Sequence, residues 1–137
     1  FLGVGGGDVV TDFVMGLGLG KWGTFWTMMA IVFVLGMFID WIGIVLICFP
    51  IFLPIAQQLG FDMLWFVVMI AVNLQSSFLT PPFGYALFYI KGIDPATIDI
   101  KDVYRGIVPF VALMIIGLVA CALFPQIITW LPGILID

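Results

Sequence analysis

The stretch "NLQSSFLTPPFG" (73–84) gathers side chains that could coordinate a cation. It contains the only Asn and the only two Ser residues of the chain, followed by two adjacent prolines. Carbonyl and hydroxyl oxygens around a small cavity replace the hydration shell of a hard cation in ion filters and transporter sites. We therefore take this stretch as the first candidate site. Its polar side chains are those of Asn73, Gln75, Ser76, Ser77 and Thr80.

The same stretch should interrupt a helix. An unbroken helix over 63–90 would be about 42 Å long. However, Pro81 and Pro82 supply no N–H group, and Pro81 disfavours the helical conformation at Thr80. The carbonyls that lose their donors must find other partners in a membrane. The alternative is a proline kink packed against neighbouring helices, with hydroxyls bonded to their own helix. We expect two half-helices, at 63–76 and 83–90.

Asp40 is a second candidate, because it is the only charged residue in 22–58. An ionisable side chain at membrane depth is a functional candidate by default. Its other interpretation is a helix cap, with the carboxylate accepting from the N–H groups of Ile42 and Gly43. The residues alone leave both roles open.

The run around Asp40 should fold back on itself. As one helix, residues 22–58 would be about 55 Å long, nearly twice a roughly 30 Å hydrocarbon core. We expect a turn between Gly36 and Gly43 and two arms of roughly 16 residues, which suit a re-entrant hairpin whose tip stops inside the membrane. Pro50 and Pro54 predict a kink or a local opening in the second arm.

The composition indicates an integral membrane protein. Hydrophobic residues make up 64% of the chain and charged residues 9%, with a mean hydropathy of +1.33, whereas roughly a quarter of a soluble domain is charged. The net charge of −4 and the lack of a basic cluster argue against nucleic-acid binding. Four charge-free intervals predict membrane-embedded segments, at 22–39, 41–61, 63–90 and 106–136.

We expect five segments in an all-α integral membrane fold. After the broken helix we expect a short amphipathic helix at the membrane interface. Thr97 would cap this helix, and Lys101, Asp102 and Arg105 would face outward. Three of the four basic residues flank this connection, which the positive-inside rule places in the cytoplasm. The segments are a Gly-rich arm with a short helix at 9–15 (1–21), a re-entrant helical hairpin (22–58), a discontinuous transmembrane helix (62–92), an interfacial amphipathic segment (93–105) and a terminal transmembrane helix (106–132).

Other chemistry has little support. The chain has no His, no Glu and no Ser outside the polar stretch, so a nucleophile and base pair for an enzyme is hard to assemble. Cys48 and Cys121 lie in apolar runs and are typical of small core residues. The first residues have no basic region of a signal peptide and no initial Met. We expect the chain to be part of a longer one.

In order along the chain, "GMFIDWIGIVLICFPIFLPIAQQLGFD" and "NLQSSFLTPPFGYALFYIKG" resemble the large membrane subunit of tripartite ATP-independent periplasmic (TRAP) transporters. The similarity covers nearly the whole chain. It implies one half of an inverted-repeat secondary transporter of the bacterial or archaeal inner membrane, multi-pass and moving like an elevator. It also implies sodium as the coupling ion, with no organic cofactor. The implied partners are a small four-helix membrane subunit and a periplasmic binding protein that delivers an organic acid such as a dicarboxylate, a keto acid or a sialic acid.

The resemblance also implies a sodium site. Its positions here are Gly36 at the hairpin tip and Ser77, Thr80 and Phe83 at the break, with backbone oxygens and the Thr80 hydroxyl as ligands. Ser77 stands where many members of the family have Gly. Substrate or gating roles are assigned more weakly to Asp40, Asn73, Gln75 and Ser76. The alternatives are a two-hairpin ion-coupled anion carrier that works without a binding protein, and a channel-type membrane subunit.

Overall fold

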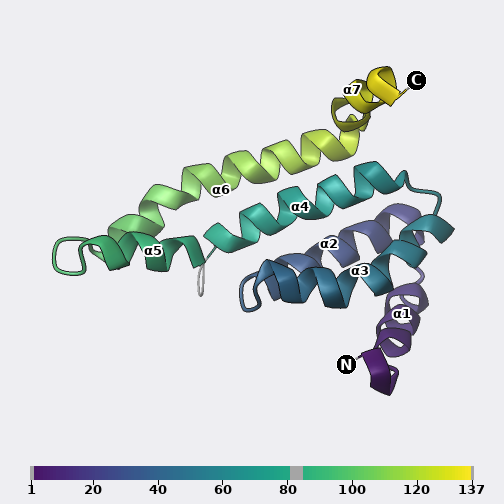
Figure 1. Cartoon of the computed structure of the whole chain (residues 1–137), viewed down its shortest axis with the longest axis horizontal. Helices are drawn as coiled ribbons and strands as arrows, with labels where there is room; N and C mark the ends of the chain where they lie inside the picture. The colour runs from purple at the N-terminus through teal and green to yellow at the C-terminus, as the bar shows by residue number, and fades with distance from the viewer. Residues whose placement is uncertain (1, 81–84, 137) are drawn as a thin grey trace.

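The computed structural model describes residues 2–80 and 85–136, and these form helices without strands (Figure 1). Their all-α character agrees with the sequence prediction. Two helices are long and apolar enough to cross a membrane, and two shorter ones are also apolar. The elements are a short 3₁₀ helix (Leu2–Val4) and the helices α1 (Gly6–Gly16), α2 (Gly20–Gly36), α3 (Trp41–Gln58), α4 (Met63–Leu79), α5 (Tyr85–Ile93), α6 (Ile100–Leu123) and α7 (Gln126–Ile136).

Helices α2 and α3 form the predicted hairpin. The chain turns between Gly36 and Trp41, inside the interval expected from the glycines, and the arms have 17 and 18 residues. Pro50 and Pro54 lie within α3, which continues through both of them as one α-helix. Gly60 has a φ of +80° in the turn that leads to α4, a conformation that favours glycine.

The predicted helix break occurs at Thr80. Helix α4 extends to Leu79, three residues beyond the expected Ser76, and Thr80 is extended with a ψ of 128°. The restriction that a proline places on the preceding residue accounts for this conformation. Asp62 starts α4, because its carboxylate accepts a hydrogen bond of 2.9 Å from the Trp65 N–H. Helix α5 follows from Tyr85.

The last part of the chain is divided differently from the prediction. Residues 93–105 and 106–132 were expected as separate interfacial and spanning segments, but one helix, α6, runs from Ile100 to Leu123. Nothing around Gly106 stops it, because one glycine lowers helix stability without ending a helix. Pro125 ends the expected span early, since it disfavours a helical Phe124, and α7 begins as a separate helix.

The cap of α6 is Asp99 and not Thr97. The Asp99 carboxylate accepts from the Lys101 N–H at 3.0 Å. Thr97 instead belongs to a turn centred on Asp94, whose carboxylate accepts from the backbone N–H groups of Ala96 and Thr97. The Thr97 side chain, and then these N–H groups, hold the pKa of Asp94 below its ordinary value. Lys101, Asp102 and Arg105 are exposed, as predicted.

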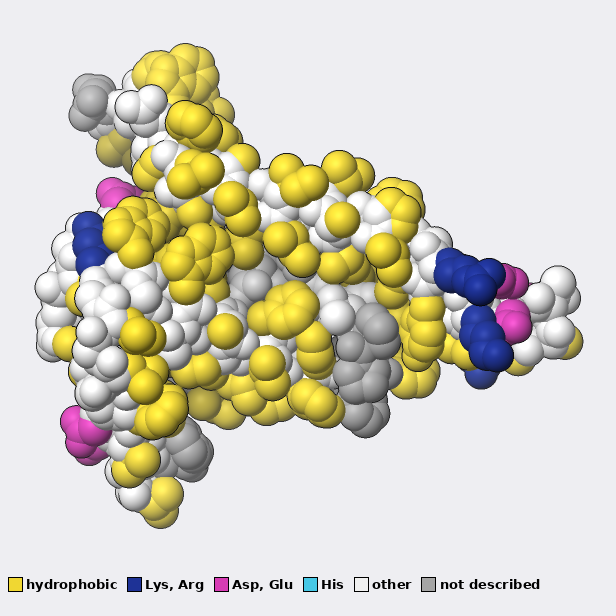
Figure 2. All heavy atoms as spheres, turned by 180° about the vertical axis from the view of Figure 1, so that it is seen from behind, with side chains coloured by type: hydrophobic (Ala, Val, Ile, Leu, Met, Phe, Trp, Pro, Cys, Tyr) yellow, Lys and Arg dark blue, Asp and Glu magenta, His cyan; other side chains and the backbone are white. Residues whose placement is uncertain are grey.

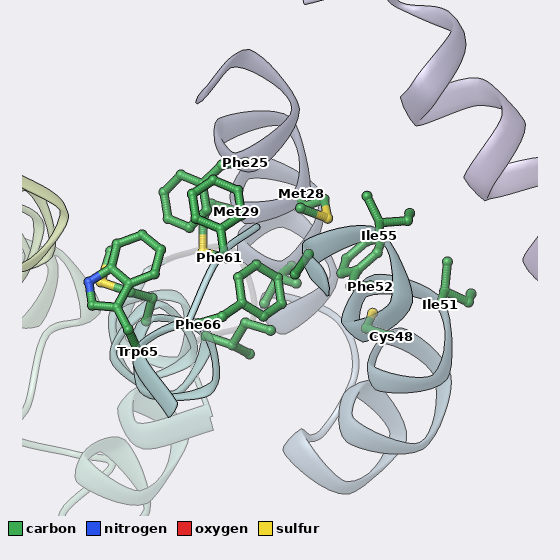
Figure 3. Close-up of a cluster of buried hydrophobic side chains, with 14 of the residues drawn as sticks. Phe25, Met28, Met29, Cys48, Ile51, Phe52, Ile55, Phe61, Trp65 and Phe66 are labelled. Atoms are coloured by element: carbon green, nitrogen blue, oxygen red, sulfur yellow. The ribbon is translucent and has the colours of Figure 1, made fainter. Parts of the chain in front are cut away.

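The core lies between the hairpin and α4. Figure 3 shows Phe25, Phe61, Trp65 and Phe66 pointing toward one another. The Phe25 ring is 5.1 Å from the Trp65 ring and nearly parallel to it. All four side chains are less than 9% exposed, so aromatic packing joins the beginnings of α2 and α4. Buried side chains of α2 and α3 fill the hairpin itself, among them Met28, Ile44, Cys48, Phe52 and Ile55.

A hydrogen bond connects this core to α6. The Trp65 indole N–H donates to the Cys121 carbonyl at 2.9 Å, across 56 residues of sequence. Helix α6 lies along α4 (Figure 1), and this bond fixes its carboxyl-terminal part.

Trp65→Phe should therefore reduce stability by about 1 kcal/mol, because it removes one interhelical hydrogen bond and keeps most of the packing. The measurement is thermal unfolding of the full-length protein in detergent. Trp130→Phe is the matched control, since Trp130 is 66% exposed. Equal melting temperatures for the two variants would contradict a role for the bond.

The outer surface is mostly apolar. Figure 2 shows hydrophobic side chains over the middle of one face and charged side chains near its ends. The basic residues lie on both sides of the α5–α6 connection at one end, Lys91 near the end of α5 and Lys101 and Arg105 near the beginning of α6. An apolar middle between charged ends is the pattern that a lipid bilayer imposes.

Candidate ion site at the hairpin tip

The structure brings the tip of the hairpin directly against the end of α4. Gly36, the last residue of α2, is buried against Ser77. A Cβ added to Gly36 would overlap the Ser77 Oγ, would lie 2.9 Å from the Ser77 Cβ and would contact the Leu74 side chain at 3.4 Å. Only glycine allows this approach. Gly36 and Ser77, which the family resemblance places in one site, are 41 residues apart in the sequence and in contact in the fold.

Ser77 lies at the centre of this contact. Its side chain is fully buried, and its hydroxyl donates to the Leu74 carbonyl at 2.8 Å. This bond turns the hydroxyl back along its own helix. Its carbonyl accepts from the Thr80 N–H at 3.1 Å. A carbonyl oxygen has two lone pairs, so the Ser77 carbonyl keeps one for a further partner.

Thr80 presents a hydroxyl at the break. The Thr80 Oγ1 donates its proton to the Ser76 carbonyl at 2.9 Å, which leaves the oxygen lone pairs available as acceptors. Thr80 is half-buried. Phe83, the fourth predicted position, lies outside the described residues.

The hairpin tip is held by hydrogen bonds of its own backbone. The N–H groups of Met37, Phe38 and Ile39 donate to the carbonyls of Val34 and Leu35. The turn therefore directs its own donors to the carbonyls that precede Gly36. Carbonyl and hydroxyl oxygens are the donors that hard cations prefer. Among the described residues, no cluster of three His, Cys, Asp or Glu side chains could hold a metal ion, so this donor set fits an alkali cation better than a transition metal.

Asp40 occupies the N-cap position of α3 but does not act as the expected cap. Its side chain makes no capping hydrogen bond, in contrast to Asp62. The backbone carbonyl of Asp40 accepts from the Ile44 N–H at 3.2 Å, and the residue is exposed. The predicted bonds from Ile42 and Gly43 are therefore wrong.

The weaker candidates on α4 face different surroundings. Asn73 is 3% exposed and donates to the Met29 carbonyl of α2 at 2.7 Å. Ser76 is 1% exposed, and its hydroxyl donates to the Val72 carbonyl at 3.2 Å. Gln75 is exposed beside an apolar cavity of about 330 Å³ between α3 and α4. Asn73 and Ser76 therefore lie on the buried side of α4, and Gln75 lies on another side.

Two residues that form interhelical hydrogen bonds, Met29 and Trp65, had no clear signal in the sequence. Met29 acts through its backbone carbonyl, which every residue type supplies. Trp65 is one of five tryptophans, and nothing around it in the sequence distinguishes it, although its indole N–H needs a partner when it is buried. That need was the one available clue.

The apolar helical hairpin, the interrupted helix that its tip meets, and the length and composition of α3 and α6 are compatible with an integral membrane protein. Residues 1–127 match the family described as "Tripartite ATP-independent periplasmic transporter, DctM component". The chain belongs to this family.

Individual relatives agree with this assignment. The sialic acid TRAP transporter permease protein SiaT of Haemophilus influenzae is 37% identical over 107 residues, which are 78% of this chain and 17% of the relative. The C4-dicarboxylate TRAP transporter large permease protein DctM of Vibrio cholerae is 30% identical over 128 residues, 93% of this chain and 28% of the relative. The 2,3-diketo-L-gulonate large permease protein YiaN of Escherichia coli is 32% identical over 104 residues, 76% of this chain and 24% of the relative. The chain thus spans less than a third of the length of these relatives.

Proposed function

We propose that this chain is one repeat of the large membrane subunit of a sodium-coupled TRAP transporter. The complete transporter imports a small organic acid across the inner membrane. A periplasmic binding protein delivers the substrate, and a small four-helix subunit braces the permease. Membership of the family supports the transporter class. The relatives are named as transporters of sialic acid, C4-dicarboxylates and 2,3-diketo-L-gulonate, which supports an organic acid as the substrate.

The contact between Gly36 and Ser77 carries the sodium part of the proposal. It joins the tip of the hairpin to the end of α4, and Thr80 follows Ser77 at the break, three residues later. Bound sodium would supply the interaction that favours this closed arrangement. Gly36 and Ser77 contribute carbonyls, Thr80 contributes its hydroxyl, and Phe83 is kept as the fourth proposed position.

The contact between the buried Gly36 and Ser77 also fits an alternating-access cycle. A hairpin that closes on α4 only when its oxygens are satisfied prevents movement of a half-loaded carrier, because bare carbonyls at membrane depth are costly. The helices around the site then move together with the substrate as an elevator. The other repeat, supplied by the rest of the permease, completes the substrate site.

Thr80→Val in the full-length transporter tests the ligand assignment. The variant keeps the shape of the side chain and removes one oxygen, so the sodium concentration for half-maximal uptake should rise roughly tenfold, in line with the loss of one hydrogen-bond-strength contact to a charge. Uptake is measured in proteoliposomes with the binding protein present. Thr129→Val, at a partly exposed position of α7 whose hydroxyl bonds to the Pro125 carbonyl just before that helix, is the control. An unchanged sodium dependence would remove Thr80 from the site.

A further inference from the structure

Asn73 forms a buried connection between α2 and α4. Its amide donates to the Met29 carbonyl at 2.7 Å, across 44 residues of sequence, and the side chain is 3% exposed. In a membrane protein, an amide of this kind commonly bonds across helices, because lipid offers it no partner. The structure therefore gives Asn73 a neighbour within the protein and not a position facing an open cavity.

The two connected helices run parallel, and three contacts fix their register. Phe25 stacks on Trp65 at their beginnings. The Met29 carbonyl meets Asn73 in the middle, and Gly36 packs on Ser77 at the end. Asn73 thus lies one helical turn before Ser77, and Met29 lies two turns before Gly36. The hydrogen bond is a directional contact between these two helices, one turn before the Gly36–Ser77 contact on α4.

The register of α2 against α4 matters because Gly36 and Ser77 lie too close for any additional side-chain atom between them. Sliding α2 along α4 by the rise of one residue, about 1.5 Å, would carry Gly36 away from Ser77 and bring other atoms of α2 to a place where even a Cβ cannot fit. Apolar packing is non-directional and resists such a slide weakly. A hydrogen bond weakens steeply when its geometry is distorted.

We propose that Asn73 is a positioning residue for the ion site. Its amide, held on the Met29 carbonyl, fixes the register of α2 against α4 that sets Gly36 against Ser77, and it thereby sets the sodium affinity without touching sodium or substrate. This inference rests on the proposed function for its transport readout. The positioning itself can be measured without transport.

The experiment compares Asn73→Leu with wild type in the full-length transporter, reconstituted in lipid nanodiscs and in proteoliposomes. Leucine has a similar volume but cannot donate. Amide hydrogen exchange of the tip, residues 33–40, is measured by mass spectrometry, and half-maximal concentrations for sodium and substrate are measured by uptake. Thr27→Val is the control, because the Thr27 hydroxyl bonds to the Gly23 carbonyl of its own helix. If Asn73→Leu is not recovered from the membrane, Asn73→Ser, too short to reach α2, is used in the same assays.

The proposal predicts faster exchange at the tip in the Asn73 variant and a roughly threefold to tenfold higher sodium concentration for half-maximal uptake, the range expected for one interhelical hydrogen bond. The half-maximal substrate concentration at saturating sodium should stay unchanged, and Thr27→Val should match wild type. Unchanged tip exchange, or a shift in the substrate value alone, would overturn the proposal. If wild-type uptake does not depend on sodium, the proposed function fails, and the exchange result still decides the positioning role.

Discussion

Gly36→Ala is expected to reduce uptake by the full-length transporter roughly tenfold or more. The added methyl group would overlap the Ser77 hydroxyl and lie 2.9 Å from the Ser77 Cβ. Overpacking of a tight contact costs about 1–3 kcal/mol, and here that cost falls on the closed state of the tip. Uptake is measured at saturating sodium and substrate, with the amount of protein in the membrane determined in parallel.

A second substitution should relieve this clash, which provides a direct test of the contact. Ser77→Gly removes both Ser77 atoms that the new methyl group meets, and the remaining neighbour, Leu74, is at an ordinary contact distance of 3.4 Å. The double variant should therefore recover much of the activity lost in Gly36→Ala. Gly92→Ala is the control, because no atom lies within 4 Å of its added Cβ. Equal loss in the single and the double variant would mean that the two residues do not meet in the transport cycle.

Phe25→Ala should give the largest loss of stability, about 3–5 kcal/mol, the range for removing a fully buried aromatic ring. Phe25 has no exposed surface, and its ring lies within 6.5 Å of the rings of Phe61, Trp65 and Phe66. The measurement is the thermal or chemical unfolding of the purified full-length protein.

The control for this variant is Phe110→Ala, which removes the same ring from a position that is 62% exposed. Its effect on unfolding should be much smaller, because an exposed ring in a membrane exchanges protein contacts for lipid contacts. A comparable loss in both variants would mean that the α2–α4 aromatic cluster is not the core that supports the hairpin.

The sequence was sufficient to predict local structure where a residue type restricts the backbone next to it. Proline restricts the residue before it, so a non-helical Thr80 was predicted correctly, although the first half-helix was expected to end at Ser76 and extends to Leu79. The length of the apolar run at 22–58 required a fold back, and the turn lies between the two glycines that bracket it. These are local or length arguments, which need no knowledge of the neighbours.

Prediction failed where two residues compete or where the backbone acts. Thr97 and Asp99 are both good caps, and the choice of Asp99 depends on the turn that Asp94 organises upstream. The partner of Asn73 is a carbonyl of another helix, which no side-chain pattern identifies.

The candidate site was half accessible to sequence reasoning. Composition and the double proline located Ser77 and Thr80, and the family resemblance added Gly36. The contact between Gly36 and Ser77 is a tertiary fact. Asn73, Ser76 and Ser77 of the polar stretch are each less than 9% exposed, in line with the rule that a membrane tolerates polar side chains where protein covers them.

A density map of the full-length transporter, recorded in sodium and again in potassium, tests the central claim most directly. The account predicts that in sodium the hairpin tip lies against α4, with Gly36 in contact with Ser77 and density for one ion bounded by carbonyl oxygens of the tip and the break and by the Thr80 hydroxyl. In potassium this density should be absent and the tip displaced. A tip that lies away from Ser77 in both salts, or a continuous regular helix through Thr80, would contradict it.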